Sequence, residues 1–481
     1  MILNFTIFDW ITFLTLPSLI IGYALMKVRR ENSLLEYYFA KGQLPTGQAA
    51  QTNFGANLAF ASAFVVFSSQ AATRGFWTLS VPIGWAIGTI LLWRLYPRVS
   101  ALLGEHTTLH EALGKITHSN HVRFWAGIWT IVAFVGTIAL EFYGAVKVMQ
   151  WAGLPNTIAY PATFGIAFAT TIFTSRGGFR RIAKVAWMLN AVSLFSIFAL
   201  LYLLLATPLL HLPTGQQVEH LLRPSPLTGD NVIFSIGMLL VFIPFQLCAF
   251  DAWQRIRATA QTATTPRWLL ASGIALAFVF LIPIFIGMDA TADEGQPIRG
   301  FLSIHQALLP VGCMGLVLAG FITAVISTAD ELLNCCSLTM LADVLQHRYF
   351  RVVKERELPE SIQATGKFYT GVFATVAAIL AIICAKYESG VTQFAVAVFS
   401  GQIVLLPWIY VILFKPNRAR EMQAGVKAAL LLSYIAIGLS LVVGWLWDSK
   451  WADAAPLLGL VVSSAVFLFE LVRAHVAPRK S

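Results

Sequence analysis

The chain has 481 residues, of which 57% are hydrophobic and only 12% are charged, and its mean hydropathy is +0.72. This composition excludes a water-soluble globular protein, because the surface of such a protein cannot hide 35 phenylalanines among its other apolar side chains. The sequence therefore predicts an all-α protein that crosses the cell membrane many times.

Apolar windows of about 20 residues, the length needed to cross a bilayer, predict thirteen transmembrane helices. They cover residues 8–26, 48–71, 76–96, 124–149, 157–173, 185–206, 232–250, 268–288, 308–333, 368–386, 391–414, 425–446 and 453–473.

Lysine and arginine are concentrated in alternate loops, which is typical of the cytoplasmic side of a membrane protein. The basic loops hold Lys27, Arg29 and Arg30; Arg98, Lys115 and Arg123; Arg176, Arg180 and Arg181; Arg255, Arg257 and Arg267; Arg348, Arg351 and Lys354; and Arg418 and Arg420, with Arg479 and Lys480 in the tail. This asymmetry predicts an N-terminus outside and a C-terminus in the cytoplasm. It also explains the net charge of +10 without a nucleic-acid partner, and it favours contacts with anionic membrane lipids.

Residues that carry enzyme chemistry are sparse. All five cysteines fall in apolar segments, so no disulfide framework is expected. His106 and His110 are four residues apart, but no third ligand follows at a fixed spacing. With no nucleophile–base or phosphate-binding pattern either, the sequence favours a protein that is not an enzyme.

Two predicted spans carry matched helix-breaking residues. The segment Asn53–Leu58 holds a glycine and two asparagines in mid-helix, and the segment Phe242–Gln246 holds a proline and a glutamine. Such breaks open the two inverted halves of many transporters. The chain is therefore expected to divide into an N-terminal helix and link (1–45), two inverted five-helix repeats (46–206 and 232–414), and two C-terminal helices with a basic tail (415–481).

A polar stretch lies at the inner end of the ninth span, where Ser327 and Thr328 precede Asp330 and Glu331. Polar groups are costly in a bilayer unless they are satisfied. Hydroxyl and carbonyl oxygens are the ligands that hard cations prefer, so a cation site is one interpretation. The other is that both hydroxyls bond to carbonyls one turn earlier.

Five short motifs resemble those of the sodium/solute symporter family, in the same order along the chain. They are Tyr37–Gly42, Thr107–Glu111, Gly177–Phe179, Asp251–Arg255 and Ser327–Leu333. The resemblance covers roughly residues 33–415. It implies a leucine-transporter-like fold and secondary active transport of a small solute.

The family resemblance implies a sodium site between the first and eighth core helices. Its ligands would be the backbone carbonyls of Gly55, Leu58 and Ala324 and the hydroxyls of Ser327 and Thr328. An aspartate on the fifth core helix supports a second sodium ion in some members. The chain has Val185 and Ala186 at those positions, so one coupling Na⁺ is expected.

Solute is expected at the midplane, against the two broken helices. The candidates are Asn53, Asn57, Phe60 and Ser62 on the first broken helix, Phe245 and Gln246 on the second, and Glu141 in the fourth span. The amides have the alternative of helix–helix hydrogen bonds. Glu141 is either a partner for a cationic group or proton, or a protonated packing residue. An amino acid or a carboxylate is favoured as the solute.

The sequence is thus consistent with two functions. The first is sodium-coupled symport of a small organic solute into the cytoplasm by alternating access. The alternative is a transport-deficient, symporter-like sensor or assembly subunit, which would need a separate protein partner. The absent aspartate at Ala186 and the acidic Glu331 in place of a family serine favour the alternative modestly.

Overall fold

The computed structural model describes residues 3, 5–26, 33–210, 227–262, 264–288, 296–346, 360–387, 391–419, 421–447 and 450–476. Within these ranges the regular secondary structure is helical, with an isolated β-bridge between Leu44 and Thr259 and no β-strand. The predicted all-α class is therefore confirmed.

The helices run in the following order. They are α1 (Ile7–Met26), α2 (Leu34–Phe39), α3 (Thr46–Asn57), the π-helix η2 (Ala61–Phe67), α4 (Ser68–Arg74), α5 (Ser80–Glu105), α6 (Leu109–Ile116), α7 (Asn120–Trp151), α8 (Asn156–Leu210), α10 (Gly229–Cys248), α11 (Phe250–Ala258), α12 (Thr265–Met288), α13 (Pro297–His305), α14 (Cys313–Thr339), the π-helix η5 (Met340–Val344), α15 (Glu360–Lys386), α16 (Val391–Ile403), α17 (Leu406–Phe414), α18 (Pro416–Ala419), α19 (Gln423–Leu446), α20 (Lys450–Asp453) and α21 (Ala455–Val476). Short 3₁₀ turns occur at Ala40–Gly42 (η1), Gly75–Leu79 (η3) and Gln306–Leu308 (η4).

Ten largely helical stretches among the described residues are long and apolar enough to cross a membrane. Two of them, Thr46–Gly104 and Asn156–Ala206, have 59 and 51 residues, more than twice the roughly 20 residues that one crossing needs. The protein is thus a multi-pass membrane protein. The count of thirteen crossings, the repeat boundaries and the sidedness of the termini stay predictions.

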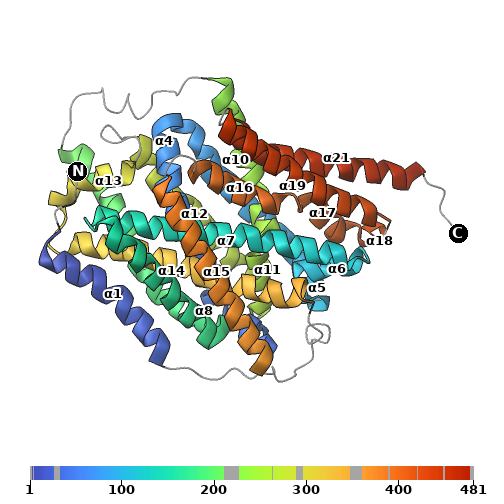
Figure 1. Ribbon diagram of the computed structural model, residues 1–481, viewed down its shortest axis with the longest axis horizontal. Coiled ribbons are helices and arrows are strands. Elements are labelled where there is room, and N and C mark those ends of the chain that lie inside the picture. The colour runs from blue at the N-terminus through green and yellow to red at the C-terminus, as the bar shows by residue number, and fades with distance from the viewer. Residues whose placement is uncertain are drawn as a thin grey trace.

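Helices α7 and α14 occupy the interior of the helix assembly. In each, 94% of the residues in the most apolar stretch are buried. Figure 1 shows α7 running through the middle of the molecule, with α15 and α8 crossing it and α19 and α21 on one side. Helix α14 packs against α7, α8, α1 and α3. Polar groups on α14 are therefore shielded from both lipid and water.

The first predicted helix break is present, at the end of the segment Asn53–Leu58 that was expected to carry it. Helix α3 ends at Asn57, and a helix resumes at Phe60 before the π-helix η2. Between them Ala59 has a positive φ of 33°, which is unusual for a residue with a side chain. The chain therefore changes direction at Leu58 and Ala59, inside the membrane-spanning stretch.

The break in the second repeat lies later than predicted. Helix α10 continues through Pro244 and ends at Cys248. Neighbouring helices in a membrane protein can satisfy the backbone groups that a proline leaves free, so Pro244 does not end the helix. The chain becomes extended at Ala249 (φ −73°, ψ 119°) and α11 begins at Phe250. The motif Asp251–Arg255 thus forms the second half of the broken helix.

A third interruption lies in α8, where Gly178 has φ 56° and ψ −170°. The predicted spans 157–173 and 185–206 are joined through this bend, within the Gly177–Phe179 motif. Two other bounds differ from expectation. The span predicted at 308–333 begins at Cys313 and extends to Thr339, and the span at 391–414 consists of the two helices α16 and α17.

Two arginines that were assigned to basic loops are instead buried. Arg123 is 6% exposed and its Nε lies 2.8 Å from Asp343 Oδ1, whereas Arg255 is fully buried beside Asp251 and Glu331. Ion pairing accounts for their burial. Of the loop residues named above, those outside the described ranges are Lys27, Arg29, Arg30, Arg348, Arg351, Lys354, Arg420, Arg479 and Lys480.

Asp343 also contacts His110, which lies on the short helix α6. The ring Nδ1 of His110 lies 2.9 Å from Asp343 Oδ2, and its Nε2 lies 2.9 Å from Thr130 Oγ1. The hydroxyl of Thr108 donates to Asp343 Oδ1 at 2.7 Å. This buried polar cluster ties the short helix α6 to α7 and to η5.

The close contact between α5 and α10 gives a test of the packing. A Cβ at Gly88 would lie 2.4 Å from the carbonyl oxygen of Ile243, whereas a Cβ at the exposed Gly165 would meet nothing within 4 Å. We expect Gly88→Ala to destabilise the protein by about 1–3 kcal/mol, as overpacking does, and Gly165→Ala to leave stability unchanged. Thermal unfolding of both variants in detergent measures this, and equal melting temperatures would contradict the packing described.

Candidate ion and solute site

The end of α3 meets α14 at Gly55. The hydroxyl of Thr328 donates to the carbonyl oxygen of Gly55 at 3.3 Å. A Cβ placed on Gly55 would lie 2.4 Å from Ser327 Oγ, so only glycine allows this approach. Both hydroxyls are buried, with Ser327 3% and Thr328 1% exposed. The structure therefore brings together the two helices on which the sodium ligands were predicted.

The other two predicted ion ligands lie beside these. Leu58 begins the break in the first repeat, and its amide donates to the carbonyl of Gly55 at 3.4 Å. Ala324 lies one turn before Thr328 on α14 and is 3% exposed. Each would contribute a backbone carbonyl. The five predicted positions thus fall in one buried region between α3 and α14, and their role as ligands stays a prediction.

Asn190 on α8 is a further oxygen donor at this place, which the sequence analysis did not single out. Its Nδ2 donates to the carbonyl of Gln51 at 2.7 Å, while its Oδ1 is buried and accepts no hydrogen bond. The same imagined Cβ on Gly55 would lie 2.5 Å from this Oδ1. The amide oxygen therefore points to the same spot as the hydroxyl of Ser327. Asn190 could have been noticed in the sequence, because it lies one helical turn after Ala186. Ala186 is a position at which the family resemblance implies a carboxylate that this chain lacks.

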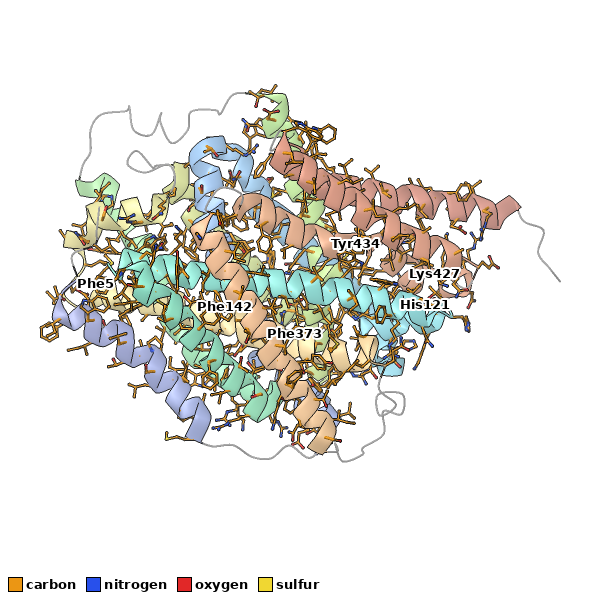
Figure 2. All side chains as sticks on the ribbon, viewed as in Figure 1. Phe5, His121, Phe142, Phe373, Lys427 and Tyr434 are labelled. Carbon is orange, nitrogen blue, oxygen red and sulfur yellow. The ribbon has the colours of Figure 1, made fainter. Side chains whose placement is uncertain are left out.

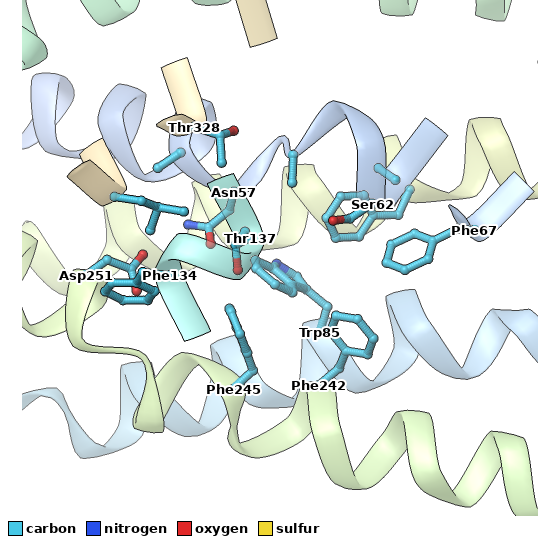
Figure 3. A pocket seen from close by; sticks show the side chains of 15 residues that line it. Asn57, Ser62, Phe67, Trp85, Phe134, Thr137, Phe242, Phe245, Asp251 and Thr328 are labelled. Carbon is cyan, nitrogen blue, oxygen red and sulfur yellow. The ribbon is translucent and has the colours of Figure 1, made fainter. Parts of the chain in front are cut away.

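A narrow cavity of about 40 Å³ lies between the two broken helices (Figure 3). Its polar lining consists of Asn57, Ser62, Thr137, Asp251 and Thr328. Its apolar lining consists of Ala56, Ala59, Ala63, Phe67, Trp85, Phe134, Phe242, Phe245, Phe280 and Leu332. A buried water needs roughly 10–15 Å³ of such space, so the cavity has room for a few water molecules. A larger solute requires the aromatic walls to move apart.

Three of the predicted solute residues line this cavity, namely Asn57, Ser62 and Phe245. The hydroxyl of Ser62 is buried and has no hydrogen-bond partner, which leaves it free for a ligand. Figure 3 shows Asn57 near the centre of the group, between Asp251 on one side and Ser62 on the other.

The other predicted residues on the broken helices lie behind the cavity wall. Asn53 donates to Ser272 Oγ at 2.9 Å and accepts from Arg255 at 2.6 Å. The ring of Phe60 stacks on that of Phe321, with centroids 4.4 Å apart. Gln246 is 3% exposed, and its Nε2 has no hydrogen-bond partner. In this conformation these residues support the site without lining the cavity.

Glu141 contacts the first helix break. It is fully buried on α7, and its Oε2 accepts a hydrogen bond from the amide of Ala61 at 3.3 Å, while the amides of Phe60 and Ser62 face the same carboxylate. Amides at the start of a helix lack carbonyl partners within that helix. Glu141 therefore caps the second half of the broken helix. Its Oε1 remains buried and unpartnered, so this geometry leaves room for the predicted role toward a cation or proton.

Asp251 is the charged side chain that sequence reasoning missed. Its Oδ2 pairs with Arg255, and its Oδ1 is buried without a hydrogen-bond partner. The same guanidinium pairs with Glu331 through Nε. Nearby on α14, Asp330 is 1% exposed and neither of its carboxylate oxygens has a partner. Carboxylates therefore outnumber basic groups in this part of the protein.

A second and larger cavity, of about 500 Å³, lies between α7 and α19. Its lining is mostly apolar and includes Trp125, Trp129, Leu431 and Ile435. Figure 2 shows His121, Lys427 and Tyr434 in this region, on the side of the molecule where α7 runs beside α19. It lacks the orphaned oxygens and the helix breaks of the central cavity. The central cavity, where polar groups converge, is therefore the better candidate for the solute site despite its smaller volume.

Several solved transporters share this architecture. A Na⁺-coupled sialic acid symporter in a substrate-bound, outward-open state matches with a TM-score of 0.73 and 15% identity over 99% of both chains. The manganese transporter of Eremococcus coleocola matches with a TM-score of 0.55 and 14% identity, over 92% of this chain and 99% of that one. Mhp1, a nucleobase-cation-symport-1 family transporter, matches with a TM-score of 0.55 and 14% identity, over 94% and 97% of the two chains.

These similarities establish the fold. The chain has the leucine-transporter-like architecture of these proteins, which are transporters and not enzymes. No family model matches the chain, and no curated protein matches its sequence. The finer resemblance to the sodium/solute symporter family therefore stays a prediction.

The contact between Glu141 and Ala61 gives a test of the capping role. We expect Glu141→Leu to destabilise the protein by about 1–3 kcal/mol, because it leaves a buried amide without an acceptor. Glu141→Gln keeps an acceptor oxygen and is expected to retain most of the stability. Thermal unfolding compares the two variants. A Gln variant as unstable as the Leu variant would show that the charge, and not the hydrogen bond, is what the position requires.

Proposed function

We propose that the protein is a secondary active transporter that couples the entry of one Na⁺ to the uptake of a small organic solute. The observation that carries the proposal is that Thr328 belongs both to the candidate ion site and to the central cavity. Its hydroxyl contacts the Gly55 carbonyl at the candidate ion site, and the same residue lines the central cavity. Ion and solute would therefore share one wall.

The shared wall gives a physical basis for coupling. A cation bound between Gly55 and Ser327 would hold the end of α3 against α14. Asn57, two residues after Gly55, would then be fixed in the cavity wall, so the solute would meet a site already ordered. Each ligand thus lowers the ordering cost of the other.

The energy for uptake would come from the ion. Moving one positive charge inward across 100 mV yields about 2.3 kcal/mol, to which the Na⁺ concentration gradient adds. Inward coupling rests on the predicted orientation, with the basic loops in the cytoplasm of a cell whose membrane is negative inside. The narrow cavity fits a conformation between the outward-open and inward-open states, from which either gate would have to open.

The oxygen of Thr328 gives a test of the ion site. We expect Thr328→Val to raise the Na⁺ concentration needed for half-maximal stabilisation about tenfold, which corresponds to about 1.4 kcal/mol of lost binding. Thr323→Val is the matched control, because Thr323 is buried on the same helix but donates to Gly320 and contacts Ser193. Melting temperatures measured against NaCl, with KCl at constant ionic strength, report the effect. An unchanged Na⁺ response in Thr328→Val would reject this site.

A transport-deficient sensor or assembly subunit is the alternative. It is favoured by Ala186, where a family carboxylate is absent, and by Glu331, which pairs with Arg255. Asn190 weakens the case, because it provides an unpartnered oxygen on the same helix as Ala186. Purified protein in liposomes separates the two functions. The transporter accumulates solute under an inward Na⁺ gradient, and the sensor binds solute without accumulating it.

A further inference from the structure

We propose that the solute carries an ammonium group and that Asp251 Oδ1 accepts a hydrogen bond from it in the central cavity. The inference deepens the proposed function and rests on the same site. It restricts the solute to amines and amino acids, and it excludes carboxylates that lack an amino group.

Asp251 is placed to contact a ligand in the cavity. The residue is 4% exposed, lines the cavity and lies in the first turn of α11, immediately after the second helix break. Arg255 holds only its Oδ2, and the buried Oδ1 has no hydrogen-bond partner. A buried carboxylate oxygen without a donor is costly. A donor supplied by the solute would satisfy it.

The balance of charge around Asp251 also favours a cationic solute. Arg255 is shared by the carboxylates of Asp251 and Glu331, and the buried Asp330 lies beside Glu331 on α14. One guanidinium thus pairs with two carboxylates, and the third, Asp330, has no partner of its own. Buried charges are stable only when they are compensated. A bound Na⁺ would supply one positive charge, and an ammonium group on the solute would supply another.

The chemistry of the cavity walls favours a cation as well. Aromatic rings attract cations over their faces, and six aromatic side chains line the cavity. Trp85 lies at the centre of this group, with its ring 5.3 Å from that of Phe280 and 5.8 Å from that of Phe245. Among the described lining residues there is no lysine or arginine that would bind a carboxylate. The walls therefore suit an ammonium group attached to a small apolar body.

Asp251 is the acidic residue placed to make this contact. Glu141 is not among the cavity-lining residues, and its Oε2 is bound to the amide of Ala61. Asp330 does not line the cavity either. Of the buried carboxylates near the helix breaks, Asp251 alone both lines the cavity and keeps an unpartnered oxygen there.

Four probes with the same branched hydrocarbon body separate the solute classes. Isobutylamine carries an ammonium group, valine carries ammonium and carboxylate, isovalerate carries only carboxylate, and isoamyl alcohol carries neither. The melting temperature of the full-length protein is measured at rising concentrations of each probe. The highest concentration is roughly 100 times the half-saturating one, or about 10 mM for a probe that does not saturate. All measurements are made in NaCl and in KCl.

We expect at least one ammonium probe to stabilise the protein in NaCl, and isovalerate and the alcohol to have no effect. Asp251→Asn should raise the half-saturating concentration of that probe at least tenfold and leave the direct Na⁺ response intact. Glu470→Gln is the matched control, because Glu470 is a buried carboxylate on α21, away from the cavity. If Asp251→Asn does not fold, Phe245→Leu removes one aromatic wall and should weaken the same probe.

The inference is overturned if no ammonium probe stabilises the protein, if isovalerate does so instead, or if Asp251→Asn binds the ammonium probe as tightly as the unmodified protein. Liposome uptake distinguishes this failure from failure of the proposed function. Na⁺-driven accumulation of isovalerate would keep symport and reject the role of Asp251. Binding of an amine that depends on Asp251, without accumulation under a Na⁺ gradient, would keep the role of Asp251 and reject symport.

Discussion

The interior of a membrane protein offers no bulk water, so every polar group freed by a break in a helix needs a partner within the protein or in a ligand. This constraint explains the arrangement around Leu58–Ala59 and Ala249. Glu141 satisfies the amide of Ala61, and Thr328 satisfies the carbonyl of Gly55. Asn190, Ser62 and Asp251 are among the buried residues near the breaks that keep an oxygen without a partner in the protein.

These three oxygens lie near the first and second helix breaks. Asn190 Oδ1 lies near Gly55 and Ser327, whereas Ser62 and Asp251 line the cavity. Thr328 contacts Gly55 and lines the cavity as well. Unpartnered buried atoms also occur elsewhere, for example at Gln402 and Ser433, so what distinguishes these three is that they surround the place where α3, α11 and α14 meet.

The sequence predicted the parts of this arrangement that depend on local chemistry. Gly55 and the Gly177–Gly178 pair marked real interruptions, because glycine permits close approach and unusual φ values. Ser327 and Thr328 were recognised because hydroxyls are conspicuous in an apolar helix. Pro244 was misleading, since tertiary packing carries the helix past it to Cys248.

Asn190, Asp251 and His110 could not be assigned from sequence, because their roles depend on contacts between distant segments. His110, for example, meets Asp343 across more than two hundred positions of the chain. The burial of Arg123 and Arg255 could not be predicted from sequence for the same reason. Counting the basic residues between apolar spans does not distinguish a solvated arginine from one buried in an ion pair.

The rings near the first helix break have a consequence for electrical insulation. Phe60 stacks on Phe321 and on Phe64, and Trp151 packs edge-on against Phe60. Beside these stacked rings, the space between the broken helices has room for only a few water molecules. Ions do not leave water for an apolar gap. The membrane potential that would drive this protein is therefore not dissipated at the first helix break while this conformation lasts.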